Sequence, residues 1–268
     1  MKSRRLGAIW LLVLLCAACA RNRIPLEYEY LSGAGTKYLW TIDSTMDIDS
    51  SVEHSSKRLR MSVDVQETLQ RPRRRGEDAV LTISLTPRTL EGTGPGNALP
   101  PPTKVQYQLK PNGQIRKPVT TELPEREASA LELGTLLAQS RLALPSRPVG
   151  IGDQWSTPLK LEGDTGTIDL KGRGRLVGFD LENGRKLARI ETRRSGQISA
   201  QEQLGGTLVL LRGTSTSTSS SMLDVDRGVL YSSRSRLASD FDLSDHRSGR
   251  LAGTLRVVLV STLELQPT

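Results

Sequence analysis

Apolar and polar residues alternate over long stretches of the chain, a pattern typical of β-strands that bury one face and expose the other. In the segment 38–49, Tyr38, Trp40 and Ile42 share one parity, whereas Thr41 and Asp43 take the other. The segment 59–65 repeats this alternation. Further strands and hairpins are predicted over 80–85, 105–119, 175–191, 206–214, 223–237 and 254–265.

Glycine-containing pairs mark the turns of three predicted hairpins. Asn112-Gly113 and Asn183-Gly184 supply the positive φ angles that a two-residue hairpin turn requires. Arg227-Gly228 is the expected turn of a third hairpin over 223–237. Hairpins of this kind favour an antiparallel sheet.

The segment 124–144 has a different pattern, because Leu133, Leu136 and Leu137 fall on one helical face. Pro124 suits the first turn of a helix. We therefore expect one central helix over 124–144. It would lie between an N-terminal β half, 36–123, and a C-terminal β half, 145–268, which are either separate units or one continuous domain. The predicted fold is mainly β, with antiparallel curved sheet arranged as a half-barrel or barrel-like structure.

The first residues are typical of an export signal. Lys2, Arg4 and Arg5 precede an apolar run over 6–15, which is too short to span a bilayer as a helix. Small residues and a cysteine follow this run. The stretch resembles the lipobox of bacterial lipoproteins, and the matching residues are Leu15, Ala17, Ala18 and Cys19.

The lipobox resemblance implies that residues 1–18 are a signal peptide cleaved between Ala18 and Cys19. Cys19 would then carry the lipid, including palmitate, and residues 19–35 would form a tether. Cys16 stands where the pattern usually has Leu. The alternative is an ordinary secretory signal cleaved near Ala20. By analogy with enterobacterial sorting, Ala20 rather than Asp after the cysteine favours the outer membrane.

Composition adds limits on stability and partners. Loss of the signal would remove three basic residues and lower the formal net charge from +8 to +5. Cys16 and Cys19 are the two cysteines of the chain, so a lipidated chain has no disulfide and depends on its core. Aromatic residues make up 4% of the chain, which predicts an aliphatic core. Basic charge in an exported protein indicates contact with anionic headgroups or solubility rather than nucleic-acid binding.

One internal stretch, LALPSRPVGIGDQW at 142–155, is distinctive. Prolines keep the chain extended, glycines permit a sharp turn, an Asp can accept backbone hydrogen bonds there, and a Trp anchors the next strand. The stretch resembles a motif of an uncharacterised family of bacterial envelope proteins and lipoproteins, whose layout of strands, helix and strands is also similar. The matching residues are Leu144, Pro145, Pro148, Val149, Gly152, Asp153 and Trp155. The resemblance implies a fold and a compartment but no activity, and we interpret the motif as structural.

Candidate chemistry is sparse. His54 and His246 lie in polar contexts, and no metal-binding motif or cysteine pair accompanies them. A Ser–His–Asp grouping around Asp242 and His246 lies within one short segment, where side chains rarely converge. Asp residues 43, 47 and 49 share one strand face, which favours a solvated face over a calcium site. We therefore predict no metal, no cofactor and no enzymatic activity.

A basic run precedes the third predicted strand. Its arginines are Arg71, Arg73, Arg74 and Arg75. They form either a solvated turn that discourages strand-to-strand aggregation or a contact with acidic lipid headgroups.

Two functions are consistent with these features. The first is a non-enzymatic binding or assembly module, anchored in the outer membrane by its lipid, with other envelope proteins or lipid as partners. The alternative is a carrier of a lipid or other apolar ligand, which requires an apolar cavity on the order of 300 Å³ or more in a concave sheet.

Overall fold

The computed structural model describes residues 23–28, 35–50, 54–70, 79–92, 99–110, 112–122, 141–163, 166–204, 207–245 and 248–267. Within these residues the chain forms twelve β-strands. They are β1 (Thr36–Ser50), β2 (His54–Gln70), β3 (Ala79–Gly92), β4 (Thr103–Leu109), β5 (Ile115–Glu122), β6 (Gln154–Ser156), β7 (Leu159–Gly163), β8 (Gly166–Glu182), β9 (Arg185–Leu204), β10 (Thr207–Asp224), β11 (Val229–Asp245) and β12 (Leu251–Leu265).

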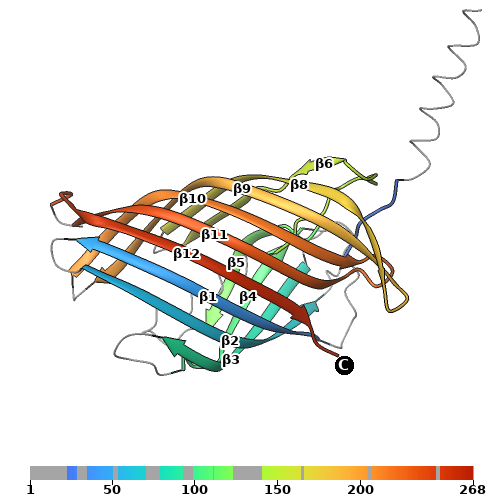
Figure 1. The fold of residues 1–268 in the computed structure, drawn as a ribbon, viewed down its shortest axis with the longest axis horizontal. Coiled ribbons are helices and arrows are strands. Elements are labelled where there is room, and N and C mark those ends of the chain that lie inside the picture. Colours follow the sequence, from blue (N-terminus) through green and yellow to red (C-terminus); the bar gives the residue numbers. More distant parts are fainter. Residues whose placement is uncertain are drawn as a thin grey trace, which may run out of the picture.

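All strands belong to one antiparallel sheet. Its order is β5-β4-β3-β2-β1-β12-β11-β10-β9-β8-β6, and β7 pairs separately with β8. The first and last strands are neighbours, since β1 pairs with β12 from Tyr38↔Leu265 to Ser50↔Gly253. This pairing joins the N-terminal and C-terminal strands in one sheet (Figure 1).

The sheet is strongly curved and encloses its apolar face on the concave side (Figure 1). Its two ends approach each other, because β7 lies beside β5 and the side-chain Nε2 of Gln114 donates to the carbonyl of Pro158 at 3.2 Å. Among the described residues no ladder joins the two ends, so the sheet is not closed. The prediction of a mainly β, antiparallel, curved half-barrel is confirmed.

The local patterns that predicted strands and turns also occur in the structure. Tyr38, Trp40 and Ile42 of β1 are buried on the concave side. Asn183 and Gly184 link β8 to β9 with φ angles of 51° and 76°, the positive values of a tight hairpin turn. Met46 departs from the alternation, since it is 37% exposed.

The prediction of a central helix over 124–144 is contradicted at its C-terminal end. Residues 124–140 lie outside the described residues. Arg141–Leu144 are not helical, so the predicted helix end at 144 is wrong. Pro145 explains this difference, because a proline disfavours the helical conformation of the residue before it. No helix among the described residues is long and apolar enough to cross a membrane.

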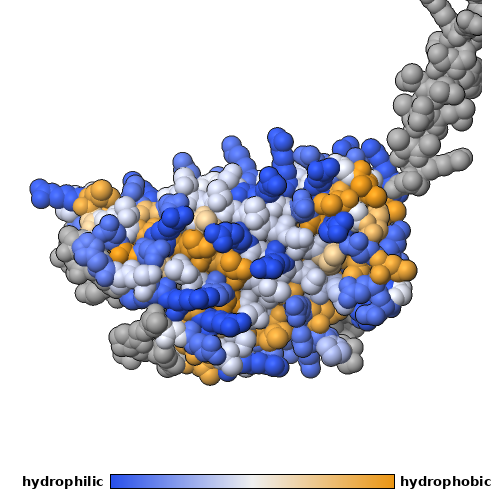
Figure 2. Space-filling view, viewed as in Figure 1, coloured by the Kyte–Doolittle hydropathy of each residue, from blue (hydrophilic) through white to orange (hydrophobic). Residues whose placement is uncertain are grey.

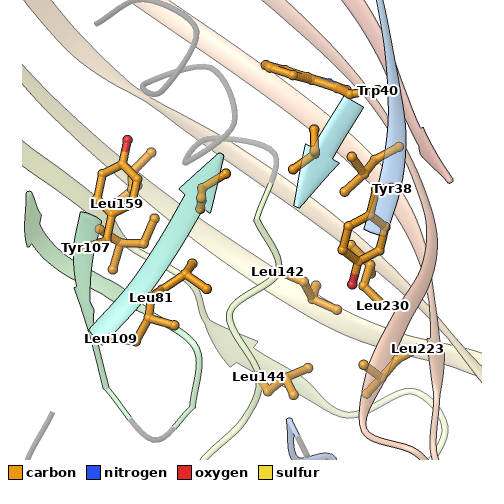
Figure 3. Packing of buried hydrophobic residues seen from close by; sticks show 14 of the residues in the cluster. Tyr38, Trp40, Leu81, Tyr107, Leu109, Leu142, Leu144, Leu159, Leu223 and Leu230 are labelled. Carbon is orange, nitrogen blue, oxygen red and sulfur yellow. The ribbon is translucent and has the colours of Figure 1, made fainter. Parts of the chain in front are cut away.

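Residues 141–149 instead form an extended interior strap that crosses the concave side of the sheet. Leu142 and Leu144 of this strap are 1% exposed. They lie between Leu81 on one side and Leu223 and Leu230 on the other (Figure 3). The strap therefore fills part of the concave side with the chain's own leucines.

Candidate functional surfaces of the sheet

The predicted motif forms a turn that joins the interior strap to β8. The Asp153 carboxylate accepts a hydrogen bond from the Gly150 amide at 3.0 Å and lies 3.5 Å from the Arg23 guanidinium. The Gly152 amide donates to the Leu176 carbonyl at 2.8 Å, and its φ of +91° suits glycine. The two contacts of the Asp153 carboxylate therefore hold the backbone of the turn and the N-terminal segment in place.

Trp155 holds the other side of this motif. Its indole Nε1 donates to the Ala143 carbonyl of the interior strap at 2.8 Å. Its ring packs on Gly174 of β8, where an added Cβ would lie 2.7 Å from the indole. Pro145 is buried in the strap, and Pro148 is exposed beside Val149, which pairs with Ile24 through two backbone hydrogen bonds of 2.9 Å. The motif thus ties the strap, β8 and the N-terminal segment together.

Two arginines with largely buried side chains hold the interior strap in place. The Arg141 guanidinium forms a 2.6 Å ion pair with Glu67 of β2, and its side chain is 9% exposed. The Arg194 guanidinium of β9 donates to the carbonyls of Thr157 and Arg141 at 3.0 and 2.9 Å. Burial lowers the pKa of Arg194 to about 10. Both groups hold backbone or a neighbouring strand, so their contacts are structural.

The concave side beyond the strap carries an unexpected band of hydroxyl groups on β9–β12. One row crosses four strands through Thr192, Ser219, Ser235 and Ser261. We call the band the hydroxyl belt, and its members are Thr192, Ser215, Ser219, Ser221, Ser233, Ser235, Ser239 and Ser261.

Cross-strand hydrogen bonds satisfy much of the hydroxyl belt. Ser221 and Ser233 share a hydrogen bond of 2.9 Å, and Ser235 and Ser261 share one of 2.8 Å. Ser239 donates to Ser215 at 2.9 Å. Such pairs typically stabilise a sheet by about 0.2–1 kcal/mol each. The belt gives the interior a polar stretch that the aliphatic composition does not predict.

One member of the belt and one tryptophan of β1 carry buried donors. Within the described residues, the hydroxyl of Thr192 and the indole Nε1 of Trp40 have no hydrogen-bond partner. Thr192 is 3% exposed and Trp40 is 0% exposed. A buried polar group of this kind costs free energy unless it is paired.

The convex side of β1–β3 is charged, and its charges form cross-strand pairs. The Arg58 guanidinium donates to both carboxylate oxygens of Asp43, at 3.1 and 2.7 Å, and this hydrogen bond lowers the pKa of Asp43. Ser56 donates to Asp47 at 2.6 Å, and Arg88 pairs with Asp64. The three aspartates weighed as a calcium site therefore lie along a ladder of such partners, in agreement with a solvated face.

The convex side of β8–β11 is also charged, but its exposed charges are mainly basic. Arg173 of β8 lies directly opposite Arg193 of β9, and the same row continues through Thr218 to Arg236 of β11. The next row contains Arg175, Glu191, Ser220 and Arg234. We call the exposed basic residues of this region the basic face, and they are Lys171, Arg173, Arg175, Arg193, Arg234 and Arg236.

The basic face lacks the pairing seen on β1–β3. In the described ranges no ion pair joins any of its six side chains to a carboxylate. Hydrophilic side chains project from the strands of this region in Figure 2. This face was not predicted from the sequence, although the alternation of basic residues with glycine in KGRGR at 171–175 signals a basic row on one side of a strand.

Several predicted site residues cannot be compared with the structure. Ala18, Cys19 and His246 lie outside the described residues, as do Arg71, Arg73, Arg74 and Arg75. His54 is exposed and lies 2.7 Å from the Asp49 carboxylate at the start of β2. Among the described residues no group of three or more His, Cys, Asp or Glu side chains is arranged to hold a metal.

Comparisons with known proteins do not identify a family. No family model matches the chain, and no curated protein matches it. Among solved structures, the chain is similar to the COG4313 outer membrane channel from Pseudomonas putida F1, with 8% identity and a TM-score of 0.33 over 90% of this chain and 98% of that one. A DUF1329 family protein from Desulfovibrio piger ATCC 29098 has 12% identity and a TM-score of 0.17 over 86% of each chain. Similarities of this size carry no argument about function.

Proposed function

We propose that this chain is an exported, lipid-anchored protein of the bacterial outer membrane that acts as a non-enzymatic binding or assembly module. The lipobox-like stretch ending in Cys19 supports the anchor. The curved sheet is the displayed module, and its partners are other envelope proteins or lipid.

The observation that carries this proposal is the content of the concave side. The interior strap places Leu142 and Leu144 in the core, where each is 1% exposed. Trp40 is fully buried, and Trp155 is hydrogen-bonded to the strap. A sheet filled in this way by its own side chains serves as a scaffold, and its contacts with partners then fall on the outer faces.

The anchor is tested by substitution of each cysteine in the full chain. Cys19→Ser is expected to block processing or release the protein from membranes, because the lipidated residue is lost. Cys16→Ser is the matched control and should leave the protein anchored. Normal processing and membrane association of Cys19→Ser would disprove the lipoprotein assignment.

The binding role is tested by affinity capture of the full chain from native membranes, with mass spectrometry of both proteins and lipids. A partner protein recovered at comparable amounts, and lost when the convex face is altered, is the expected result. Recovery of the chain without any partner protein after solubilisation in several different detergents would count against the assembly role.

The second candidate, a lipid carrier, has one observation in its favour. Two unpaired donors on the concave side, the hydroxyl of Thr192 in the belt and the indole Nε1 of Trp40, suit a polar headgroup. The belt and the strap both oppose it, because an acyl chain gains nothing from hydroxyl groups and the leucines already occupy apolar space. Native mass spectrometry separates the two, since a carrier retains a lipid in a one-to-one ratio and a scaffold does not.

A further inference from the structure

The strongest feature that the proposed function leaves unexplained is the basic face. Six exposed basic side chains gather on β8, β9 and β11, and Glu191 is the carboxylate that stands among their two main rows. On the convex side of β1–β3, Arg58 and Arg88 are each paired with an aspartate. The charge imbalance is therefore local to one half of the sheet and is not a general property of its outer surface.

The pairing of Arg173 with Arg193 points to an anion. These residues are direct cross-strand partners, both are exposed, and like charges in that position destabilise a sheet. An anion that bridges the two guanidinium groups would convert this repulsion into attraction. Arginine suits phosphate in particular, because its planar fork can donate two parallel hydrogen bonds to phosphate oxygens.

The dimensions favour an extended anionic surface over a single small anion. Lys171 and Arg175 are four residues apart on β8, a distance of about 13 Å along a strand. The row from Arg173 to Arg236 crosses three interstrand spacings, about 14 Å in all. Thr216, Thr218 and Ser220 of β10 are exposed between the basic strands and add hydroxyl donors.

We infer that the basic face binds the anionic phosphate headgroups of the membrane beside which the chain is held. The inference rests on the proposed function for the tether that brings the two together. Charge complementarity selects the occupant, since basic residues near an anionic leaflet are each worth about 1 kcal/mol of attraction. The sheet then lies with the convex side of β8–β11 toward the headgroups and the convex side of β1–β3 toward solvent.

The experiment measures co-sedimentation of the full chain with vesicles of phosphatidylcholine alone and of phosphatidylcholine mixed with phosphatidylglycerol, at several NaCl concentrations. The apolar N-terminal run would bind both vesicle types, so the ratio between the two isolates the basic face. One variant neutralises the face, and its substitutions are Lys171→Gln, Arg173→Gln, Arg193→Gln and Arg236→Gln. The control removes the same number of exposed charges elsewhere, and its substitutions are Lys37→Gln, Lys104→Gln, Arg147→Gln and Arg250→Gln.

The unaltered chain should prefer the anionic vesicles, and this preference should decrease as NaCl rises. The face variant should lose between about tenfold and about a thousandfold of that preference, from four charges near the surface. The control variant should lose less than about threefold, since scattered charges act only through net charge. A third variant, with Arg173→Lys, Arg193→Lys and Arg236→Lys, keeps the charge but loses the planar fork, so its preference should lie between those of the unaltered chain and the face variant.

Three results would overturn the inference. Equal binding to both vesicle types, or equal loss in the face and control variants, would exclude a dedicated surface. Displacement by inorganic phosphate beyond the effect of NaCl at matched ionic strength would assign the face to a soluble anion instead. A vesicle result of this kind leaves the anchor untouched, because the anchor is judged separately by the release of Cys19→Ser.

Discussion

Gly174 is where the packing of the predicted motif is tightest. An added Cβ would lie within 2.9 Å of three atoms of the Trp155 ring, and that ring is held in place by its hydrogen bond to Ala143. Gly174→Ala should therefore lower the free energy of unfolding by about 1–3 kcal/mol, the usual cost of overpacking. Urea unfolding followed by tryptophan fluorescence measures this.

Gly178 of the same strand provides the control. An added Cβ there would lie 3.6 Å from the Arg189 guanidinium, an ordinary contact. Gly178→Ala should leave stability within about 0.5 kcal/mol. Equal losses in the two variants would mean that Trp155 does not pack as tightly as the structure places it.

The stability of the fold depends on both partners of the buried ion pair between Arg141 and Glu67. Their side chains are 9% and 13% exposed, so removing one partner leaves a charge that water does not reach well. Glu67→Gln and Arg141→Met should each cost about 3 kcal/mol of stability, whereas the double variant should cost less than either single one. A double-mutant cycle in urea measures the coupling, and additive losses would contradict a buried pair.

Tyr107 links stability to alkaline pH. It is 4% exposed, and burial raises the pKa of its hydroxyl well above the ordinary value of 10.0. Above about pH 10 the unfolded chain releases this proton and the native state keeps it, so the free energy of unfolding falls by up to about 1.4 kcal/mol per pH unit. Below that pH both states hold the proton and the contribution is constant.

Arg194 acts in the opposite direction, because its lowered pKa lets the native state release a proton first between about pH 10 and its ordinary value of 12.5. The comparison of the unaltered chain with Tyr107→Phe cancels that effect. The stability difference between them should be level up to about pH 9.5 and should then shift in favour of Tyr107→Phe. Parallel stability profiles up to pH 11 would show that Tyr107 ionises as easily in the native state as in the unfolded chain.

At the scale of elements, the hairpin of β8 and β9 carries a like-charge pair that one substitution can convert into an opposite-charge pair. Arg173→Glu places a carboxylate opposite Arg193 and should raise the melting temperature, since an opposite-charge cross-strand pair contributes about 0.2–1 kcal/mol. The same substitution should weaken binding to phosphatidylglycerol vesicles. Stability and binding thus move in opposite directions, and a variant that lost both would indicate damage to the hairpin instead.

The strands and tight turns could be predicted because their signals are local. Tyr38, Trp40 and Ile42 alternate with polar residues, and Asn183-Gly184 fits a turn that demands positive φ. The interior strap was not predicted, because the helix over 124–144 rested on Leu133, Leu136 and Leu137, which precede the strap. Leu142 and Leu144 are two residues apart, a spacing that places both on one side of an extended segment.

The hydroxyl belt and the basic face depend on strand neighbours that sequence does not reveal. In the Ser/Thr tract 214–221 every residue is small and polar, so no alternation of apolar and polar residues marks Ser215 and Ser221 as inward. Arg173 and Arg193 are 20 positions apart, and their opposition follows from the register of β8 and β9. Registers of this kind are set by the whole sheet.

At the scale of the whole molecule, the middle of the sheet is formed by β1, β12 and β11, whereas β6 and β7 are short and peripheral. Amide hydrogen exchange should therefore be slowest in β1, β12 and β11 and faster by orders of magnitude in β6 and β7, whose hydrogen bonds open without global unfolding. Exchange measured by mass spectrometry tests this order. Fast exchange in β12 would contradict its central position.

The adjacency of β1 and β12 also has a consequence for synthesis and delivery of the chain. The strands β1–β5 and β8–β11 can pair as they emerge, but the seam between the two groups needs the 15 residues of β12, which follow all of these strands in the chain. Until they arrive, β1 and β11 are both open edges that another copy of the chain can pair with. The interval before β12 is delivered is therefore the period of greatest aggregation hazard, and a chain truncated before β12 remains in it permanently.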